Sequence, residues 1–544
     1  MSGYPQLRPA FRDETGKCID WRCTRIGSNP PDRGRCAGYH CPYCDTPTGM
    51  TGHRCPQRPD PDAPGLVAVQ GGDEVETGGS AGMPKVQRKD EMTGVTIYGE
   101  ADERTIAQIK RCQEAEEGSK AVLCADSHLG YSMPIGGAVA YREHVSPSGV
   151  GYDIGCGNKA VRTNIRVSDV LGTRPSRTVA QIMDEIVRRV SFGMGRNNDE
   201  PASHPVLDQI KEAPFAPQRQ LYDLAANQLG TVGSGNHYVD LFADEAGWLW
   251  IGVHFGSRGF GHKTASGFLA LAQGKKFDEH ANEGEMDSPP VVFSIDSELG
   301  QSYIEAMELA GAYAYAGRDV VVDTVLDILG AFADFAVHNH HNFAWREEHD
   351  GEDFWVVRKG CTPAFPGQQG FVGSTMAEVS VVLEGTESAE AALFSTVHGA
   401  GRTMSRTEAK GKIKRRKRWE CSECGHQEGQ PGQLAKHIQE AHPESLEKPI
   451  SVEAIMRGDA PVRGIKRQFD EQIRPGKVDW DAELANMGTL GIELRGAAAD
   501  EAPPAYKRLD EVLAAHGDTI RILHRLRPIG VAMAGPDIHD PFKD

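Results

Sequence analysis

Histidine, cysteine and aspartate residues recur along this chain beside glycines, a pattern suited to binding metal ions and phosphate groups. Asp153 and Cys156 lie in the segment Gly-Tyr-Asp-Ile-Gly-Cys-Gly, and His398 lies in Ser-Thr-Val-His-Gly-Ala-Gly-Arg. Similar segments rich in Gly, Asn or Ser hold His128, His237, His254 and His341. Backbone N–H groups in such turns can approach an anion closely while the side chains reach a cation. Because several of these segments occur in one chain, we predict an active site built from loops.

The residue types in these segments indicate a transition-metal site. A cysteine ligand must be the thiolate, which a bound metal enforces by lowering the pKa of the thiol. A mixture of thiolate, imidazole and carboxylate ligands does not select one metal, because affinity follows the Irving–Williams order and favours copper or zinc. The residues alone therefore predict a metal site and leave the identity of the metal open.

These motifs, in this order, resemble the RtcB family of RNA ligases from roughly Val95 to near the C-terminus, with one insertion. That family joins an RNA 3′-phosphate or 2′,3′-cyclic phosphate to a 5′-hydroxyl, using GTP and manganese, through a guanylylated histidine. The resemblance implies that His398 is this histidine. It also implies two manganese ions, whose ligands are Asp153, Cys156, His237, His254 and His341.

The resemblance implies a nucleotide pocket with two departures from the family pattern. Asp240 replaces a glutamate that follows the Asn-His pair, so its carboxylate reaches less far. Near the C-terminus the family carries a lysine at the guanine base, whereas this chain offers only Met533 or Ala534. The reaction class is kept, and the nucleotide preference stays open. The implied nucleotide-binding residues are Asn236, Asp240, Ser374, Met376, Gly399, Ala400, Gly401, Arg402 and Tyr506.

The reaction implied by the resemblance is nucleotidyl transfer, in RNA repair or tRNA splicing. His398 attacks the α-phosphorus of GTP, the nucleotide passes to the RNA 3′-phosphate, and the 5′-hydroxyl then expels GMP. The expected partners are RNA with those ends and an archease-like activator. Two alternatives remain. One is a divergent metal-dependent nucleotidyltransferase with another nucleotide or substrate, and the other is a non-catalytic RNA-binding zinc-finger scaffold.

The insertion, residues 419–443 within the ligase domain, has the spacing of a two-Cys, two-His zinc finger. Its ligand pattern is Cys421-x2-Cys424-x12-His437-x4-His442. Trp419 and Leu434 are expected core residues, and zinc could fold a segment that otherwise lacks a core. We predict a structural zinc site. Binding to nucleic acid, binding to protein and bracing of a loop all remain open as its role.

A basic run precedes the insertion, with seven Lys or Arg among the nine residues from Lys410 to Arg418. It is either a solvated helix face that leads out of the His398 motif or a basic segment beside that histidine that binds the RNA backbone. Arg402 and Arg406 follow His398 at helical spacing, so they could bind phosphates or form structural ion pairs.

Asp126 and His128 share a loop that could position RNA or a neighbouring ligand, although Asp126 could instead cap and order the turn. Both readings stay open from the sequence.

The N-terminal residues 1–57 differ from the rest of the chain and predict a second, small zinc module. Cys41 and Cys44 form a Cys-x-x-Cys pair, and the stretch 58–90 is a Pro- and Gly-rich flexible linker. The remaining cysteine spacing fits no finger type, so a loosely ordered tail with free thiols is the alternative. The candidate ligands are Cys18, Cys23, Cys36, Cys41, Cys44 and Cys55.

Length and composition favour a soluble enzyme with accessory parts. The 544 residues exceed the roughly 250–300 residues of a single core, and we assign 91–544 to the ligase domain. The formal charge of −18 argues against nonspecific nucleic-acid coating but allows a local basic channel. No membrane span or signal peptide is recognisable, so we expect a cytoplasmic protein in which cysteines are thiols or metal ligands.

Hydrophobic periodicity predicts an α+β domain, in which mixed β-sheets and helices surround a metal-lined pocket, together with small zinc-stapled modules. Apolar residues at helical spacing predict helices over 178–190 and 302–338, the second broken near Gly317. His341 would then lie at or just past a helix end. Strands and helices do not alternate regularly, which disfavours a doubly wound sheet.

Three β-rich runs, at 150–154, 248–254 and 378–383, predict strands. Such strands could deliver Asp153, Cys156 and His254 to one face of the domain.

Overall fold

The computed structural model describes residues 87–89, 94–172, 175, 177–281, 286–443 and 465–535, with the backbone alone described at 87–89, 413–417 and 465–473. The chain divides into two compact units, Met1–Met83 and Pro84–Asp544. The predicted N-terminal cysteine module lies outside the described residues, as does most of the predicted linker. The description below concerns the second unit.

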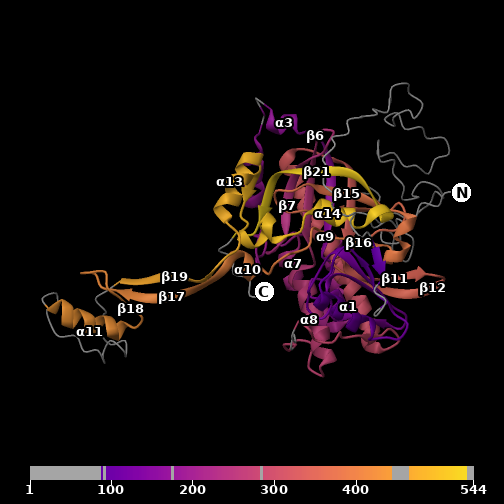
Figure 1. The fold of residues 1–544 in the computed structure, drawn as a ribbon, viewed down its shortest axis with the longest axis horizontal. Helices are drawn as coiled ribbons and strands as arrows, with labels where there is room; N and C mark the ends of the chain where they lie inside the picture. Colours follow the sequence, from indigo (N-terminus) through magenta and orange to yellow (C-terminus); the bar gives the residue numbers. More distant parts are fainter. Residues whose placement is uncertain are drawn as a thin grey trace. The chain divides into compact units, whose positions relative to one another are not determined.

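The larger of two main sheets has eight strands (Figure 1). Seven are hydrogen-bonded in the order β10-β6-β8-β7-β21-β15-β14, each antiparallel to its neighbour, and β20 (Glu493–Arg495) pairs in parallel with β21. The strands of this row are β6 (Gly157–Arg166), β7 (Tyr238–Ala243), β8 (Trp248–Phe255), β10 (Ala333–His340), β14 (Gln369–Val372), β15 (Ser380–Gly385) and β21 (Ile520–Met533).

The second main sheet has the strand order β1-β2-β3-β4-β12-β11 and carries Asp126. Two short strand pairs accompany it, β5 with β9 and β13 with β16, and the last of these ends directly before His398. The bounds are β1 (Gln87–Lys89), β2 (Thr96–Tyr98), β3 (Lys120–His128), β4 (Ile135–Tyr141), β5 (His144–Val145), β9 (Phe293–Ser294), β11 (Asn342–His349), β12 (Glu352–Lys359), β13 (Cys361–Pro363) and β16 (Ser395–Val397).

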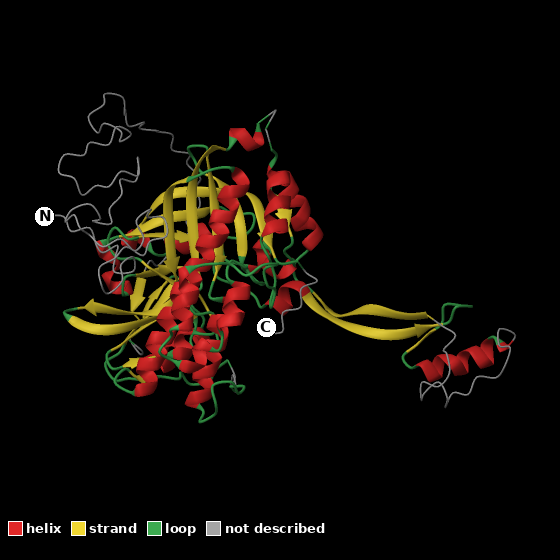
Figure 2. Ribbon diagram, turned by 180° about the vertical axis from the view of Figure 1, so that it is seen from behind, coloured by secondary structure: helices red, strands yellow, loops and turns green. Residues whose placement is uncertain are grey.

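Helices cover the larger sheet on one face, as Figure 2 shows. Side chains of α4 and α9 share a core with strands β7, β8 and β21, including Ile186, Val325, Leu241 and Ile251. The described α-helices are α1 (Glu103–Gln113), α2 (Pro147–Val150), α3 (Ser168–Leu171), α4 (Val179–Arg189), α5 (Pro205–Lys211), α6 (Ala216–Arg219), α7 (Tyr222–Gln228), α8 (Arg258–Ala272), α9 (Glu298–Leu329), α10 (Arg406–Lys410), α11 (Pro431–Ala441), α13 (Trp480–Leu490) and α14 (Leu509–Ala514). The predicted α+β fold is confirmed.

The predicted helix over 178–190 is confirmed as α4, which a capping box of Thr178 and Gln181 begins. The predicted break near Gly317 is wrong, because α9 continues through it from Glu298 to Leu329. A Cβ at Gly317 would lie 3.3 Å from the Phe255 ring, so the glycine permits close packing of helix on sheet. The segment 333–338 is strand, and His341 therefore follows a strand end, not a helix end.

The predicted strands at 248–254 and 378–383 correspond to β8 and most of β15, whereas the strand at 150–154 is wrong. Ser146 caps a short helix with Pro147 at its first position, and Gly151 then adopts φ 85°. This left-handed conformation suits glycine and turns the chain into a loop. Asp153 and Cys156 consequently sit on a loop.

The basic run is a strand, which corrects its reading as a helix face. Helix α10 ends at Lys410, since Gly411 adopts φ 81° and its Cα faces the Arg474 carbonyl too closely for any Cβ. Strand β17 (Gly411–Glu420) then pairs antiparallel with β19 (Ile465–Pro475) in a long ribbon (Figure 1). The far end of β17 pairs with β18 (Gln427–Glu428), which leads into α11.

Candidate active site

The five predicted metal ligands lie at one end of neighbouring strands of the larger sheet. His254 is on β8, Cys156, His237 and His341 directly flank β6, β7 and β10, and Asp153 is on the loop before β6. Cys156 directly precedes β6, and His341 directly follows β10, whose last residue pairs with Gly157. His254 on β8 pairs with Asn158 on β6 and with Tyr238 at the start of β7, so His237 lies beside it. The strand order therefore gathers ligands that are up to 188 positions apart in sequence, from Asp153 to His341.

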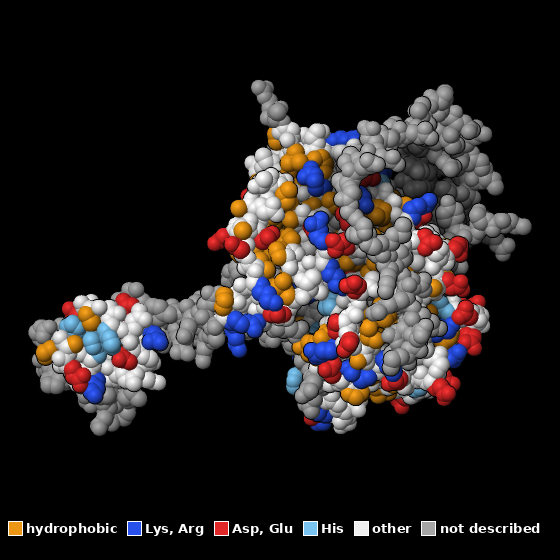
Figure 3. Space-filling model, in the orientation of Figure 1, with side chains coloured by type: hydrophobic (Ala, Val, Ile, Leu, Met, Phe, Trp, Pro, Cys, Tyr) orange, Lys and Arg blue, Asp and Glu red, His pale blue; other side chains and the backbone are white. Residues whose placement is uncertain are grey.

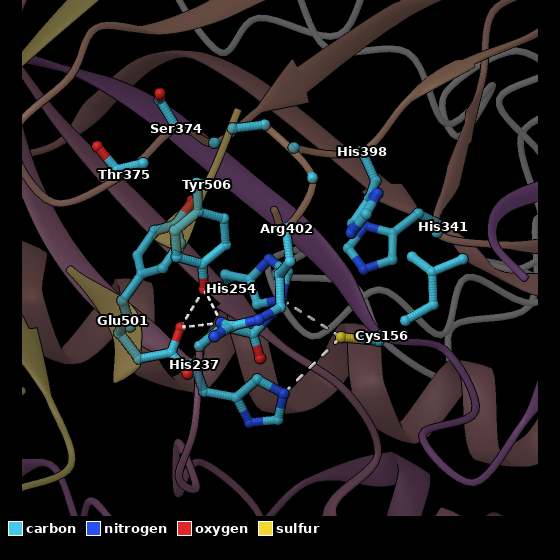
Figure 4. A pocket seen from close by; sticks show the side chains of 18 of the residues that line it. Cys156, His237, His254, His341, Ser374, Thr375, His398, Arg402, Glu501 and Tyr506 are labelled. Atoms are coloured by element: carbon cyan, nitrogen blue, oxygen red, sulfur yellow. Dashed lines mark hydrogen bonds and ion pairs between the residues drawn. The ribbon is translucent and has the colours of Figure 1, made fainter. Parts of the chain in front are cut away.

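These ligands form two groups of three that share one thiol (Figure 4). The ligand atoms of Asp153, Cys156 and His237 lie within 4.8 Å of one another, and so do those of Cys156, His254 and His341. Cys156 Sγ lies 3.8 Å from His237 Nε2 and 3.5 Å from His254 Nε2, and His237 Nε2 lies 3.1 Å from Asp153 Oδ2. Each group could hold one divalent cation, and the Cys156 thiol would be within reach of both.

The histidines are oriented by hydrogen bonds at their other ring nitrogen. His237 Nδ1 lies 3.0 Å from the Val232 carbonyl oxygen, and His254 Nδ1 lies 2.6 Å from Asn158 Oδ1. If these nitrogens donate, the Nε2 lone pairs face the shared thiol, which is how a metal-binding imidazole is held. His341 Nδ1 is buried without a hydrogen-bond partner among the described residues.

The protonation of the groups also suits a cation. Burial holds the pKa values of His254 and His341 well below the usual value, which keeps both imidazoles neutral. Burial opposes ionisation of Asp153, but hydrogen bonding to His237 outweighs it and lowers the pKa to about 2. Burial and then Asp153 raise the pKa of the Cys156 thiol well above its usual value. A thiolate here therefore needs the positive charge of a bound metal.

One buried guanidinium joins the segments that carry these ligands. Arg318 of α9 is 0% exposed and donates to the Gly155 and Phe255 carbonyl oxygens at 2.9 and 2.5 Å. It also donates to His338 Nε2 at 2.8 Å and lies 2.9 Å from His340 Nδ1. Gly155, Phe255 and His340 each adjoin a metal ligand. Sequence analysis missed this residue, although a charged residue within the apolar pattern of a helix was the available signal.

His398 lies beside the second ligand group, its ring centroid 4.8 Å from that of His341. Its Nδ1 lies 2.7 Å from Asp126 Oδ2, and the same oxygen accepts the His398 backbone N–H at 3.0 Å. Asp126 is 0% exposed. Burial opposes its ionisation, but the charge and hydrogen bonds of His398 lower its pKa below the usual value. The carboxylate thus fixes Nδ1 as the protonated nitrogen and leaves the His398 Nε2 lone pair for attack.

A single cavity of about 290 Å³ joins the metal ligands, His398 and the predicted nucleotide residues. His128 and Lys359 also line it, as do Arg406 and Glu501, which sequence analysis did not place in the nucleotide pocket. Met533 lines the cavity, and Ala534 does not belong to its lining. The predicted residues in its wall are Asn236, Asp240, Ser374, Met376, Gly399, Ala400, Gly401, Arg402 and Tyr506.

Comparison with known proteins decides the family. The family model described as "tRNA-splicing ligase RtcB" matches residues 108–445. This chain belongs to the RtcB family. It is 29% identical over 429 residues to the RNA-splicing ligase RtcB of Escherichia coli, which covers 74% of this chain and 87% of the relative. It is also similar to the tRNA-splicing ligases RtcB of Archaeoglobus fulgidus, 30% identical with 53% and 74% covered, and of Thermococcus kodakarensis, 29% identical with 60% and 83% covered.

Acidic residues hold the arginines of this RtcB-family pocket, as Figure 4 shows for Arg402. Arg402 donates to the Tyr506 hydroxyl at 3.0 Å and to the Asp500 carbonyl at 2.8 Å, and it lies 3.5 Å from Glu501. Arg406 forms an ion pair with Glu501, which also accepts from the Tyr506 hydroxyl. Of the two roles predicted for Arg402 and Arg406, structural ion pairs are the one that these contacts show. Both side chains also line the cavity, so binding of phosphates stays a prediction.

Asp240 forms no ion pair with the residues that the structure describes, although its carboxyl group has a hydrogen bond with the Ala532 backbone. It is buried on β7, and its Oδ1 accepts no hydrogen bond from the described residues. Burial raises its pKa well above the usual value. Met376 and Met533 line the same cavity, so its surroundings favour the neutral acid.

The inserted segment brings its four predicted ligands together. The ligand atoms of Cys421, Cys424, His437 and His442 lie within 4.8 Å of one another, and Cys424 Sγ lies 3.2 Å from His437 Nε2. Leu434 is buried against Cys421 and Ile438, with Trp419 packed on this small cluster. The end of β17, the short strand β18 and helix α11 bring two thiols and two imidazoles together, an arrangement that fits a tetrahedral zinc ion.

Proposed function

We propose that this chain is an RNA ligase that joins RNA 3′-phosphate or 2′,3′-cyclic phosphate ends to 5′-hydroxyl ends through a nucleotidylated histidine. The arrangement of His398 carries this proposal, because its Nε2 is left for attack and it shares a cavity with two metal-ligand groups. The names of the curated relatives, RNA-splicing and tRNA-splicing ligases, support it. RNA repair or tRNA splicing is the corresponding role, in the cytoplasm.

The residues present fit two divalent cations, which we take to be manganese, bound by Asp153, Cys156 and His237 and by Cys156, His254 and His341. When bound, such ions neutralise phosphate oxygens. Zinc fits the Cys421 site, and an archease-like protein remains a candidate activator. Among the described helices, none is long and apolar enough to cross a membrane.

In the first step His398 Nε2 attacks the α-phosphorus of GTP, so that an N–P bond forms and pyrophosphate leaves. The imidazole then carries a positive charge, which the carboxylate of Asp126 stabilises through Nδ1–H. An oxygen of the RNA 3′-phosphate next attacks the same phosphorus and releases His398. Finally the 5′-hydroxyl oxygen attacks the RNA phosphorus, forms the phosphodiester and expels GMP. A cyclic end must first take up water to become the 3′-phosphate.

The identity of the nucleotide is the part of this proposal for which a second candidate, ATP in place of GTP, has support. A carboxylate can accept both N–H groups of the guanine edge, whereas a neutral acid offers one donor and one acceptor, which matches the adenine edge. The buried Asp240 with its raised pKa and the presence of Met533 in the wall favour a nucleotidyltransferase of altered base preference. We retain GTP as the first candidate and ATP as its competitor.

The test is incubation of the purified protein with manganese and either α-labelled GTP or α-labelled ATP. We expect acid-labile label on the wild type and none on His398→Ala, followed by transfer of the label to RNA that ends in a 3′-phosphate. Label from ATP alone would replace GTP in the proposal. A metal-loaded wild type that takes label from neither nucleotide would overturn nucleotidyl transfer.

A further inference from the structure

The β17–β19 ribbon is the largest feature that the reaction does not use. It begins at Gly411, directly after α10, and α10 contains Arg406, which lines the active-site cavity. The segment therefore leaves the wall of the cavity and runs for ten residues of β17 before it reaches the zinc-finger-like module. At about 3.3 Å per residue, this is a span of roughly 33 Å.

The ribbon is strongly positive in a chain that is negative overall. Its two strands contain nine Lys or Arg and three Asp or Glu, a formal charge of +6, whereas the whole chain carries −18. The module at its end, residues 421–443, has one Lys and three Glu, a formal charge of −2. Figure 3 shows acidic, basic and histidine side chains mixed on the visible face of that module. The positive charge therefore belongs to the ribbon and not to the finger.

The strand register adds an energetic argument. Lys412 lies opposite Arg474 and Arg418 lies opposite Arg467, whereas Lys414 and Arg415 lie opposite Glu471 and Asp470. Like charges directly opposite one another destabilise an antiparallel pair. A polyanion bound along the ribbon would relieve the repulsion in the two like-charge pairs. Single-stranded nucleic acid presents one phosphate about every 3.4 Å.

We infer that the β17–β19 ribbon binds the phosphate backbone of the RNA strand next to the end being joined, and that the zinc finger closes the ribbon without reading bases. This inference rests on the proposed RNA substrate. The ribbon's span corresponds to about ten phosphates of a stacked strand. RNA is favoured over an acidic protein because the positive charge extends along the ribbon and the ribbon starts at the cavity where RNA ends would react.

The test compares two full-length variants with equal charge change. The ribbon variant is Lys414→Gln/Arg416→Gln/Arg418→Gln. The control is Arg346→Gln/Lys436→Gln/Arg521→Gln, whose side chains are 67%, 69% and 69% exposed. The affinity for a single-stranded RNA of about 30 nucleotides is measured against salt concentration, since each phosphate contact contributes about 0.7 to the slope.

We expect the ribbon variant to lose about two units of slope and about tenfold or more in affinity at low salt, while the control stays within about twofold. Oligonucleotides of about four nucleotides, too short to reach along the ribbon, should bind both variants alike. Equal slopes in the ribbon variant, the control and the wild type would overturn the inference and leave the ribbon to another partner. A base-sequence preference that disappears in Cys424→Ser would also overturn it, by assigning base reading to the finger.

Label transfer to His398 separates this inference from the proposed function. Both variants should accept nucleotide at the wild-type rate, since neither changes a residue of the cavity. A wild type that binds RNA through the ribbon but takes up no nucleotide would overturn the reaction alone. Normal labelling with no ribbon-dependent RNA affinity would overturn the ribbon inference alone.

Discussion

The candidate active-site pocket and the zinc-finger-like module both gather thiol and imidazole groups, but they do so by different means. In the pocket, four neighbouring strands and a large buried core hold the ligands, which come from positions 153 to 341. In the module, the ligands are within 22 positions of one another, and the core consists of Cys421, Leu434 and Ile438 with Trp419 against it. A fold with its own core can position a metal site in advance, whereas a segment with so small a core depends on the metal for its folding.

The largest effect expected is that of Cys156→Ala. The variant loses the thiol that both ligand groups share, and with it several kcal/mol of the stabilisation that the metals give to the transition state. The rate of nucleotidylation should therefore fall by roughly a thousandfold or more. Because the core holds the pocket, the melting temperature should change by only a few degrees. The matched control is Cys112→Ala, a buried thiol outside the cavity, which should keep its labelling rate. Global unfolding of Cys156→Ala would contradict the idea of a preformed pocket.

The second prediction concerns Asp126→Asn, which should reduce the rate of nucleotidylation by roughly a hundredfold to ten-thousandfold, because the wrong tautomer of His398 is then favoured. Metal content, measured in parallel, should not change.

The same pair gives a pH dependence. The pKa of Asp126 is lowered in the folded protein, so its stabilisation is present above the unfolded aspartate pKa and disappears as pH falls through the folded value. The melting-temperature difference between wild type and Asp126→Asn should therefore shrink on acidification below about pH 4. A difference that grows in acid would contradict the role of the Asp126 carboxylate as the acceptor of this hydrogen bond.

The third prediction tests whether Arg318 is a positioning residue. Arg318→Met leaves two buried carbonyl oxygens without their donor, at about 1–3 kcal/mol for each unsatisfied group. Manganese affinity should fall about tenfold to a hundredfold, as for other residues that orient ligands. Titration with a manganese-sensitive chelator measures the affinity. Arg318→Lys keeps the charge but loses the forked donors of the guanidinium group. Its manganese affinity should lie between those of the wild type and Arg318→Met. A positioning role would be contradicted if the loss of manganese affinity only paralleled the loss of folding stability and Arg318→Lys restored none of it.

The smallest catalytic effect is expected for Cys424→Ser. The module should lose zinc and become sensitive to protease within 421–443, while nucleotidylation stays within about twofold of wild type. Bound zinc measured by mass spectrometry, together with limited proteolysis, gives the readout, and Cys361→Ser serves as a control for a buried thiol outside the module. If the variant keeps its zinc and is cleaved like the wild type, the module does not depend on this metal site for its folding, and the contrast with the pocket fails.

The sequence predicted those elements whose signals lie within the element itself. Helix α4 and strand β8 were predicted because their periodicity and capping are local. Gly317 was misread as a break, since only the packing of α9 against Phe255 shows why a glycine belongs inside that helix. The helix-face reading of the basic run, one of the two left open by the sequence, was wrong because β17 depends on pairing with β19, some fifty residues later.

The candidate site divides in the same way. The residue types and glycine-rich motifs predicted a metal site, and the family resemblance that the motifs carry implied the individual ligands, His398 and the lining of the pocket. The motifs gave no indication that Arg318 joins the ligand segments or that Asp126 orients His398. The contacts of Arg318 reach segments from 20 to 163 positions away, and Asp126 and His398 are 272 positions apart. The zinc-finger spacing was readable directly, since all four ligands fall within one short segment.

The sequence by itself determined the chemical groups, their motifs and the family resemblance, because these reside in the identity and local order of residues. Only the tertiary structure decided that Cys156 belongs to both ligand groups, that Asp126 contacts His398 Nδ1 and not Nε2, and that the basic run is a ribbon directly after α10, whose Arg406 lines the cavity. Those features follow from strand order and burial, and both are properties of packing between distant segments.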